Sequence, residues 1–276
     1  MGKQKRSANT YQKINTIFLR DDKGVIMPEA PLVKPEFEYL RNVKWHAEEK
    51  IDGTNMRIEV KSRIEYQVDQ IHNIEFEETN IPLGVHFEVR IAGKTDNAQI
   101  PKNLLKHMQE KYPDEKVLEA LGLKKYIPVE EWADHKWNSE KDIPYMYTIY
   151  GEGYGEGIQS GGWYIKNGNE FIVFDVKVNN LYLNIGSRNE IAMKLGAPIV
   201  PFMGEFTIDE AIDFVKNGFR SQIAENPDAK MAEGLVLRTK VGLCDRMGER
   251  LILKVKHEDF VKYTNSKISE LKNLKI

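Results

Sequence analysis

The sequence predicts an α+β fold built from antiparallel sheets with helices on the outside. Strand candidates occur near the start, in the middle and at the end of the chain, with helix candidates between and after them. An Asp-Gly pair at residues 52–53, set between two strand candidates, predicts an antiparallel hairpin. Together these two observations favour sheets of antiparallel strands over a regular alternation of strand and helix.

Size and composition fit a soluble globular protein. The chain has 276 residues, with 41% hydrophobic and 30% charged residues and a net charge of −2. A single cysteine, Cys244, cannot form an internal disulfide, which favours a reducing compartment, and we expect the cytoplasm. No apolar run reaches the length of a membrane span, so no membrane association is expected.

The N-terminal part contains the stretch around which the rest is organised, residues 48–57. Residues 1–10 read as a disordered basic tail, residues 11–20 and 44–50 as strands, and residues 35–40 as a short helix. Lys50 ends the second strand, directly before the Asp-Gly turn. The next strand alternates two kinds of residue, which predicts one buried apolar face and one polar face: Met56, Ile58 and Val60 against Asn55, Arg57 and Glu59.

The remaining elements follow from periodicity and turn residues. Apolar residues at helical spacing predict helices, and alternating or short apolar runs predict strands. A glycine-rich stretch, residues 151–157, is predicted to be a turn where a strand stops at Glu152. The predicted strands are 63–69, 85–90, 145–150, 171–176, 233–238 and 251–256, and the predicted helices are 101–112, 113–121, 188–195, 208–217 and 257–271.

Two nucleotide-binding motifs are excluded. Gly93-Lys94-Thr95 ends like a P-loop, but Glu88 stands where the first glycine of that motif is required. The glycine-rich stretch offers no Gly-x-Gly-x-x-Gly register.

The last predicted strand places two lysines on one face. Lys254 and Lys256 alternate with Leu253 and Val255, so the lysines project to the same side. Such a pair belongs either to a solvated edge strand or to an anion site. A lysine that acts as a nucleophile must first lose its proton, and neighbouring cations favour that loss. Lys50 together with this pair therefore predicts phosphate chemistry.

Three further residues have side chains suited to binding a nucleoside triphosphate and its metal ion. Glu233 offers a carboxylate to Mg²⁺, which usually binds one or two carboxylates plus phosphates and water. Glu152 can accept hydrogen bonds from ribose hydroxyls, and Phe174 offers a ring for base stacking.

Five stretches in this order resemble the motifs of the covalent nucleotidyltransferases, the superfamily of ATP-dependent DNA and RNA ligases and mRNA capping enzymes. Within them, Glu49-Lys50-Ile51-Asp52-Gly53-Thr54-Asn55 resembles the Glu-Lys-x-x-Gly-x-Asn signature of phage-type RNA ligases of the nick-sealing branch. The five stretches are residues 50–53, 150–152, 171–175, 233–236 and 254–256.

The resemblance implies an ATP-dependent RNA ligase with the adenylation-domain fold of these enzymes, in which antiparallel sheets enclose a nucleotide cleft. Lys50 would attack ATP to give lysyl-AMP, the AMP would move to a 5′-phosphate end, and a 3′-hydroxyl would displace it. ATP and Mg²⁺, or Mn²⁺ in its place, would be the cofactors. The substrate would be RNA or a nicked RNA/DNA duplex.

The resemblance also implies a role for each candidate residue. Lys254 and Lys256 would contact the α-phosphate, and Glu233 would organise the metal. Arg90 is expected to share a phosphate role with Lys94, which stands where the family often has arginine. The nucleoside contacts would come from Glu49 near the adenine edge, Phe174 on the adenine, Glu152 on the ribose, and Asn55 and Arg57 near ribose or phosphate.

The domain organisation is expected to be simple. Only 20 residues (257–276) follow Lys256, too few for the oligonucleotide-binding barrel of DNA ligases, so residues 11–276 are predicted to form one adenylation domain. We expect a monomer. A partner protein that contributes to substrate binding is an open alternative. The alternatives are a DNA ligase, a guanylyltransferase or a non-catalytic nucleic-acid-binding relative.

Overall fold

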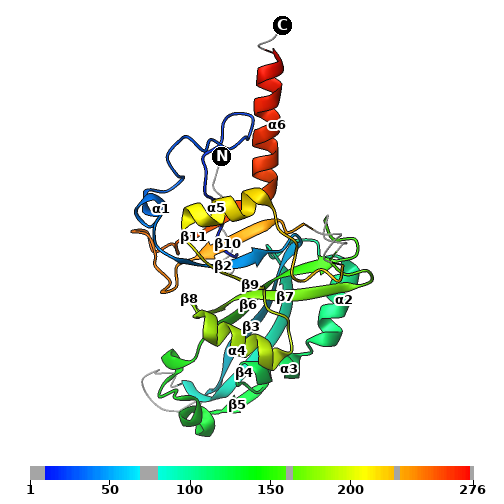
Figure 1. Ribbon diagram of the computed structural model, residues 1–276. Coiled ribbons are helices and arrows are strands. Elements are labelled where there is room, and N and C mark those ends of the chain that lie inside the picture. Colours follow the sequence, from blue (N-terminus) through cyan, green and yellow to red (C-terminus); the bar gives the residue numbers. More distant parts are fainter. Residues whose placement is uncertain (1–9, 69–79, 160–163, 227–230, 274–276) are drawn as a thin grey trace. The chain divides into compact units, whose positions relative to one another are not determined.

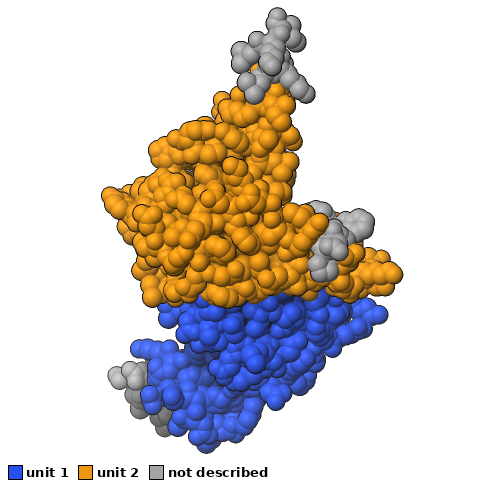
Figure 2. Space-filling model, in the orientation of Figure 1, with its two compact units in different colours: residues 1–10, 54–153, 169–199 blue, residues 11–53, 154–168, 200–276 orange. Residues whose placement is uncertain are grey.

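The computed structural model describes residues 10–68, 80–159, 164–226 and 231–273. Residues 1–9 of the predicted basic tail lie outside the described residues. The chain separates into two compact units, each made of several stretches of sequence (Figure 2). Unit 1 contains residues 54–153 and 169–199, and unit 2 contains residues 11–53, 154–168 and 200–276. The prediction of a single domain stays a prediction, and each unit is described by itself.

Unit 1 is built on a six-stranded sheet in the order β5-β4-β3-β6-β7-β8. The long strand β3 pairs with β4 on one side and with β6 on the other, antiparallel in both cases. The bounds are β3 Thr54–Val68, β4 Asn80–Gly93, β5 Tyr126–Pro128, β6 Met146–Gly155, β7 Asn169–Val178 and β8 Leu181–Tyr182.

The helices of unit 1 begin and end at residues that the sequence marks. Pro101 and Pro113 directly precede the helices α2 and α3, where a missing backbone N–H costs nothing. The Asn184 side chain caps α4, and Gly196 ends it in the left-handed conformation. Figure 1 shows α3 and α4 side by side. The bounds are α2 Lys102–Lys111, α3 Asp114–Ala120 and α4 Ile185–Leu195, with 3-10 helices η1 Val129–His135 and η2 Glu140–Asp142.

Unit 2 is built on a five-stranded sheet in the order β1-β11-β10-β2-β9. The short strand β1 is parallel to β11, and the other neighbours are antiparallel. The bounds are β1 Asn15–Thr16, β2 Trp45–Lys50, β9 Phe202–Phe206, β10 Gly234–Arg238, β11 Ile252–Lys256, α1 Pro35–Tyr39, α5 Ile208–Asn217 and α6 His257–Asn273.

The core of unit 2 lies between the sheet and α5, which covers the strands in Figure 1. A capping box of Thr207 and Glu210 starts α5. Its buried residues Ile208, Ala211 and Val215 belong to one cluster with the inward residues of β2, β10 and β11. This packing holds β2, which ends at Lys50, β10, which begins directly after Glu233, and β11, which carries the lysine pair.

The predicted α+β class with antiparallel sheets is confirmed, and so are most predicted elements. None of the helices in the described part of the chain combines the length and apolar character that a membrane span requires. Of the predicted strand 11–20, only Asn15 and Thr16 form a strand, with isolated bridges at Phe18 and Arg20.

The predicted Asp-Gly hairpin is wrong. β2 pairs with β9 and β10, whereas β3 pairs with β4 and β6, so the two strands belong to different sheets. Trp45 and Ala47 on β2 are buried in the core of unit 2, while Met56 and Ile58 are buried in unit 1. The Asp-Gly pair therefore links two sheets, because long-range packing of each strand outweighs the local turn preference.

The predicted turn at Glu152 is also wrong, because β6 continues to Gly155. A Cβ at Gly151 would lie 2.3 Å from the Phe171 ring, and one at Gly153 would lie 2.3 Å from a methyl of Leu104. These glycines allow close packing within a strand, rather than a turn.

Candidate active site

Three strands of unit 2 bring two lysines to either side of one glycine. In the register of the sheet, Gly234 on β10 is opposite Lys50 on β2 and Lys256 on β11. The φ of Gly234 is +151°, and a Cβ there would lie 1.9 Å from the Val255 carbonyl oxygen. A side chain at this position would therefore separate the strands, so glycine keeps the row together.

Glu233, directly before that glycine, joins the two lysines. Its Oε2 lies 2.6 Å from Lys50 Nζ, and its Oε1 lies 2.6 Å from Lys256 Nζ. The side chain of Glu233 is only 15% exposed, so both contacts are charge-assisted hydrogen bonds at a partly buried site. The backbone is held as well, since the His257 N–H donates to the Glu233 carbonyl oxygen at 3.0 Å.

The lysine pair on β11 shares one face, as predicted, while Leu253 and Val255 are buried on the other. Burial, followed by the charges of Lys50 and Lys256, lowers the pKa of Lys254. Burial also acts to lower the pKa of Lys256, but the hydrogen bond and charge of Glu233 outweigh it, and the pKa is raised. Lys256 is thus held as a cation by Glu233, whereas burial and the neighbouring lysines disfavour the charge on Lys254.

A second charged group lies further along the same strands and was not assigned a role from the sequence. The buried Glu48 carboxylate is 2.9 Å from Arg238 and 3.2 Å from His46 Nε2. Strand alternation alone places Glu48 on the same face as Lys50, two residues away. From this alternation alone, the sequence could have predicted that Glu48 lies on the same face as Lys50.

Glu49 lies elsewhere. Its buried carboxylate accepts hydrogen bonds from the Ser221 hydroxyl at 2.5 Å and from the Gln222 N–H at 2.8 Å. As the neighbour of both Glu48 and Lys50, it projects to the opposite face of β2. The predicted role of Glu49 near the adenine edge stays a prediction.

In unit 1, strands β3 and β6 place two predicted nucleoside-binding residues next to each other. Asn55 is opposite Glu152, and Arg57 is opposite Tyr150. The Oδ1 atom of Asn55 is buried and has no hydrogen-bond partner among the described residues. A buried acceptor of this kind is costly unless something donates to it, so a ligand hydroxyl or amino group would fit here. Phe174 lies half-buried on β7, the next strand of the sheet.

Arg57, which the sequence placed on the polar face of this strand, is fully buried. Its Nε donates to Glu59 at 2.7 Å, and its Nη1 donates to the carbonyls of Gly93 and Lys94 at 2.6 and 2.9 Å. Its Nη2 pairs with the Asp96 carboxylate. The guanidinium therefore fastens the loop after β4, and Glu59 and Asp96 are site neighbours that sequence reasoning missed.

The other two basic candidates lie around the same loop. Arg90 is 49% exposed and reaches the Asp96 carbonyl at 3.4 Å, and Lys94 is exposed. Both are open to an anion, and their phosphate roles stay predictions.

Replacing Arg57 by Met is expected to destabilise the protein by about 3–5 kcal/mol, because Glu59 would remain buried without its cation. Replacing Arg90, an exposed neighbour of the same Asp96, by Met should change stability by no more than about 0.5 kcal/mol. Urea unfolding of both variants measures the difference. A loss below about 1 kcal/mol for Arg57→Met would show that the guanidinium does not hold this loop.

The carboxylates set limits on a metal site. The described residues contain no group of three or more His, Cys, Asp or Glu side chains that could hold a metal ion. Glu233 supplies a carboxylate oxygen beside the lysines, which would fit Mg²⁺ or Mn²⁺ where phosphates and water complete the coordination.

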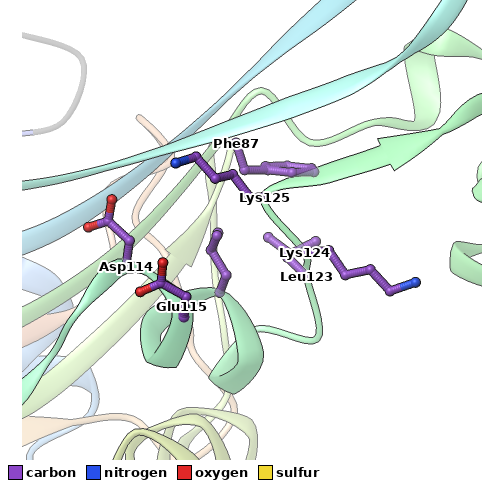
Figure 3. Close-up of a pocket in the computed structure, with 7 residues that line it drawn as sticks. Phe87, Asp114, Glu115, Leu123, Lys124 and Lys125 are labelled. Carbon is purple, nitrogen blue, oxygen red and sulfur yellow. The ribbon is translucent and has the colours of Figure 1, made fainter.

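Two cavities formed by described residues of unit 1 contain few of the candidate residues. One has a volume of about 130 Å³, below the range for a nucleotide-sized ligand, and contains no predicted site residue (Figure 3). A second, of about 350 Å³, includes only Arg90 from the predicted set. The first is lined by Phe87, Asp114, Glu115, Leu118, Leu123, Lys124 and Lys125.

Comparison with solved structures shows a shared fold. A Naegleria gruberi RNA ligase variant with ATP and Mn aligns with a TM-score of 0.50 and 16% identity, over 94% of this chain and 63% of that one. A variant of the same ligase with AMP and Mn aligns with a TM-score of 0.50 and 15% identity, over 91% and 62%. This chain thus spans less than two thirds of the length of those ligases. No curated protein sequence matches the chain.

The family comparison covers most of the chain. The model of the RNA ligase family matches residues 43–256, a range that includes every predicted site residue from Glu49 to Lys256. The chain therefore belongs to the RNA ligase family.

Proposed function

We propose that this protein is an ATP-dependent RNA ligase that joins 5′-phosphate and 3′-hydroxyl ends through lysyl-AMP on Lys50. The observation that carries the proposal is the Glu233 carboxylate, held 2.6 Å from both Lys50 and Lys256. The Naegleria gruberi ligase, with its ATP and Mn or AMP and Mn, supports the same cofactors here.

The first step needs a neutral amine. The Lys50 amine is engaged by Glu233 at 2.6 Å, so this contact must loosen before the amine reaches a phosphorus atom. The Nζ lone pair then forms a bond to the α-phosphorus, the bond to the pyrophosphate oxygen breaks, and the amine proton leaves to solvent. Lys254 and Lys256 offset the charge on the phosphates. A divalent metal held by Glu233 would add positive charge at the same phosphates.

The roles proposed for unit 1 concern the nucleoside. Glu152 and Asn55 would contact the ribose or phosphate, and Phe174 would stack on the adenine. The cross-strand pairing of Asn55 with Glu152 and the unpartnered Asn55 Oδ1 support this assignment.

Radiolabelled nucleotides test the proposal. With ATP labelled at the α-phosphate and Mg²⁺, label should remain on the denatured protein and should transfer to a 5′-phosphorylated RNA end. Labelling by GTP instead would indicate a guanylyltransferase, and sealing confined to DNA strands would indicate a DNA ligase. No label from either nucleotide would indicate a non-catalytic relative.

Lys254→Ala is expected to slow the formation of lysyl-AMP by at least about tenfold, or 1.4 kcal/mol of barrier. The reason is that Lys254 shares the face of Lys256 and lies in the positive field of Lys50. Single-turnover labelling measures the rate, with Lys240→Ala, which removes an exposed partner of Glu205, as control. Adenylation at the wild-type rate by Lys254→Ala would show that the lysine pair is part of a solvated strand face and does not bind phosphate.

Sealing of nicked duplexes with RNA at the 3′-hydroxyl side is expected to outpace joining of free single strands, most of all at raised salt. A nicked duplex presents both ends already aligned, and phosphate contacts weaken as salt rises. Initial rates of pre-adenylated protein on both substrates across a salt series measure this preference. Equal or faster joining of free strands throughout would contradict it.

A further inference from the structure

The peptide that follows Lys50 is held at both of its polar groups. The Ile51 carbonyl oxygen accepts a hydrogen bond from Lys50 Nζ, at 3.4 Å. The Asp52 N–H, which belongs to the same peptide plane, donates to the Tyr164 hydroxyl oxygen at 2.9 Å. Because the peptide is planar, fixing the direction of the N–H also fixes the direction of the carbonyl. Tyr164 therefore determines where the carbonyl beside the Lys50 amine points.

Tyr164 is itself firmly placed. Its side chain is fully buried, and the Tyr154 ring packs edge-on against it at 5.5 Å between centroids. Its carbonyl oxygen accepts a hydrogen bond from the Glu225 N–H at 2.8 Å. Burial raises the pKa of the Tyr164 phenol far above its ordinary value, so the group stays un-ionised. The phenol is thus a rigid, neutral hydrogen-bonding group for the turn after Lys50.

Among the described residues, the Lys50 amine has two hydrogen-bond acceptors, Glu233 and the Ile51 carbonyl, and the proposed reaction would affect them differently. Glu233 is the stronger one, at 2.6 Å, but its carboxylate is also the proposed metal-binding group. If Glu233 were to hold a divalent metal instead, the Ile51 carbonyl would be the remaining acceptor of this pair.

We propose that Tyr164 is a positioning residue for Lys50, which fixes the Ile51–Asp52 peptide so that its carbonyl holds the amine in place for attack. This inference rests on the proposed function. It assigns Tyr164 no contact with ATP or RNA, and so it predicts a change in the rate of adenylation without a change in ATP affinity.

Tyr164→Phe tests the proposal, because it keeps the ring and removes the oxygen that accepts from Asp52. In single-turnover adenylation, the maximal rate should fall by about tenfold, whereas the ATP concentration at half-maximal rate should change by less than about twofold. Tyr263→Phe is the matched control: it removes a hydroxyl of unit 2 that donates to Glu29, and it should leave both values unchanged. An unchanged maximal rate in Tyr164→Phe, or a loss confined to ATP affinity, would overturn the proposal.

Chemical labelling gives a readout that does not depend on ligase activity. The proteins are treated with trace acetic anhydride, and acetylation of each lysine is measured by peptide mass spectrometry. In Tyr164→Phe, acetylation of Lys50 relative to the exposed Lys61 should rise about threefold, the factor expected for the loss of one modest hydrogen bond. An unchanged ratio would overturn the positioning role of Tyr164, whether or not the wild-type protein forms lysyl-AMP. Absence of lysyl-AMP from the wild-type protein would instead refute the proposed function.

A gentler variant guards against misfolding. Tyr164→3,5-difluorotyrosine keeps the ring and the oxygen but makes the oxygen a weaker acceptor. Its adenylation rate and Lys50 acetylation should lie between those of wild type and Tyr164→Phe. Wild-type values for both would contradict the proposal.

Discussion

Lys50→Ala and Lys50→Arg are both expected to leave no AMP on the denatured protein after incubation with ATP and Mg²⁺. Alanine removes the amine, and arginine replaces it with a guanidinium that stays protonated and cannot attack phosphorus. Arginine is the sharper variant, because it keeps a cation that can still pair with Glu233. Loss of label in Lys50→Arg therefore separates nucleophilic attack from charge alone.

Lys44→Arg is the matched control for this experiment. Lys44 directly precedes the strand that ends at Lys50, but its amine pairs with the exposed Glu210, so its replacement should leave labelling unchanged. Label retained by either Lys50 variant at the wild-type level would remove Lys50 from the mechanism.

Glu233→Gln is expected to slow adenylation by about a hundredfold, the scale seen when one preorganised electrostatic group is removed from an active site. The amide has the size of the carboxylate but lacks its charge, so it would no longer hold the Lys50 and Lys256 amines in place through two charge-assisted hydrogen bonds. The oxygen donor for a divalent metal would also be weakened. Both effects act on the phosphate-transfer step.

Single-turnover rates across a Mg²⁺ series measure this loss. Glu205→Gln, which removes the charge from an exposed pair with Lys240 in the same unit, serves as control and should behave as wild type. A Glu233→Gln rate within about threefold of wild type would show that the bridge between the lysines is a structural ion pair without a catalytic role.

Structural features that depend only on neighbouring residues in the chain could be predicted from the sequence. Alternation placed Lys254 and Lys256 on one face of β11, because side chains on a strand alternate whatever the strand pairs with. In the structure, prolines directly precede α2 and α3, a capping box starts α5, and a left-handed glycine ends α4. These features depend on neighbours in the chain and so can be read without a structure.

Features that depend on distant residues could not be predicted. Strand pairing separated β2 from β3 despite the Asp-Gly pair, and packing against Phe171 and Leu104 kept glycines inside β6. Arg57 and Glu59 on the polar face of β3 are buried, and Arg57 has partners 36 to 39 residues away in the sequence.

The candidate site shows the same division. The residue types and their order predicted Lys50, Glu233, Lys254 and Lys256, and the structure brings all four together on one face of the unit 2 sheet. The hydrogen bond between Tyr164 and the peptide after Lys50 spans 112 residues, and no local pattern indicates it.

Peptide mapping of the adenylated protein tests the central claim most directly. The wild-type chain is incubated with ATP and Mg²⁺, digested, and examined by tandem mass spectrometry for the peptide that carries AMP. We predict that AMP is found on Lys50, that it disappears when pyrophosphate is added, and that it transfers to a 5′-phosphorylated RNA end. AMP on another residue, or no AMP in a preparation that nevertheless seals RNA, would contradict the account.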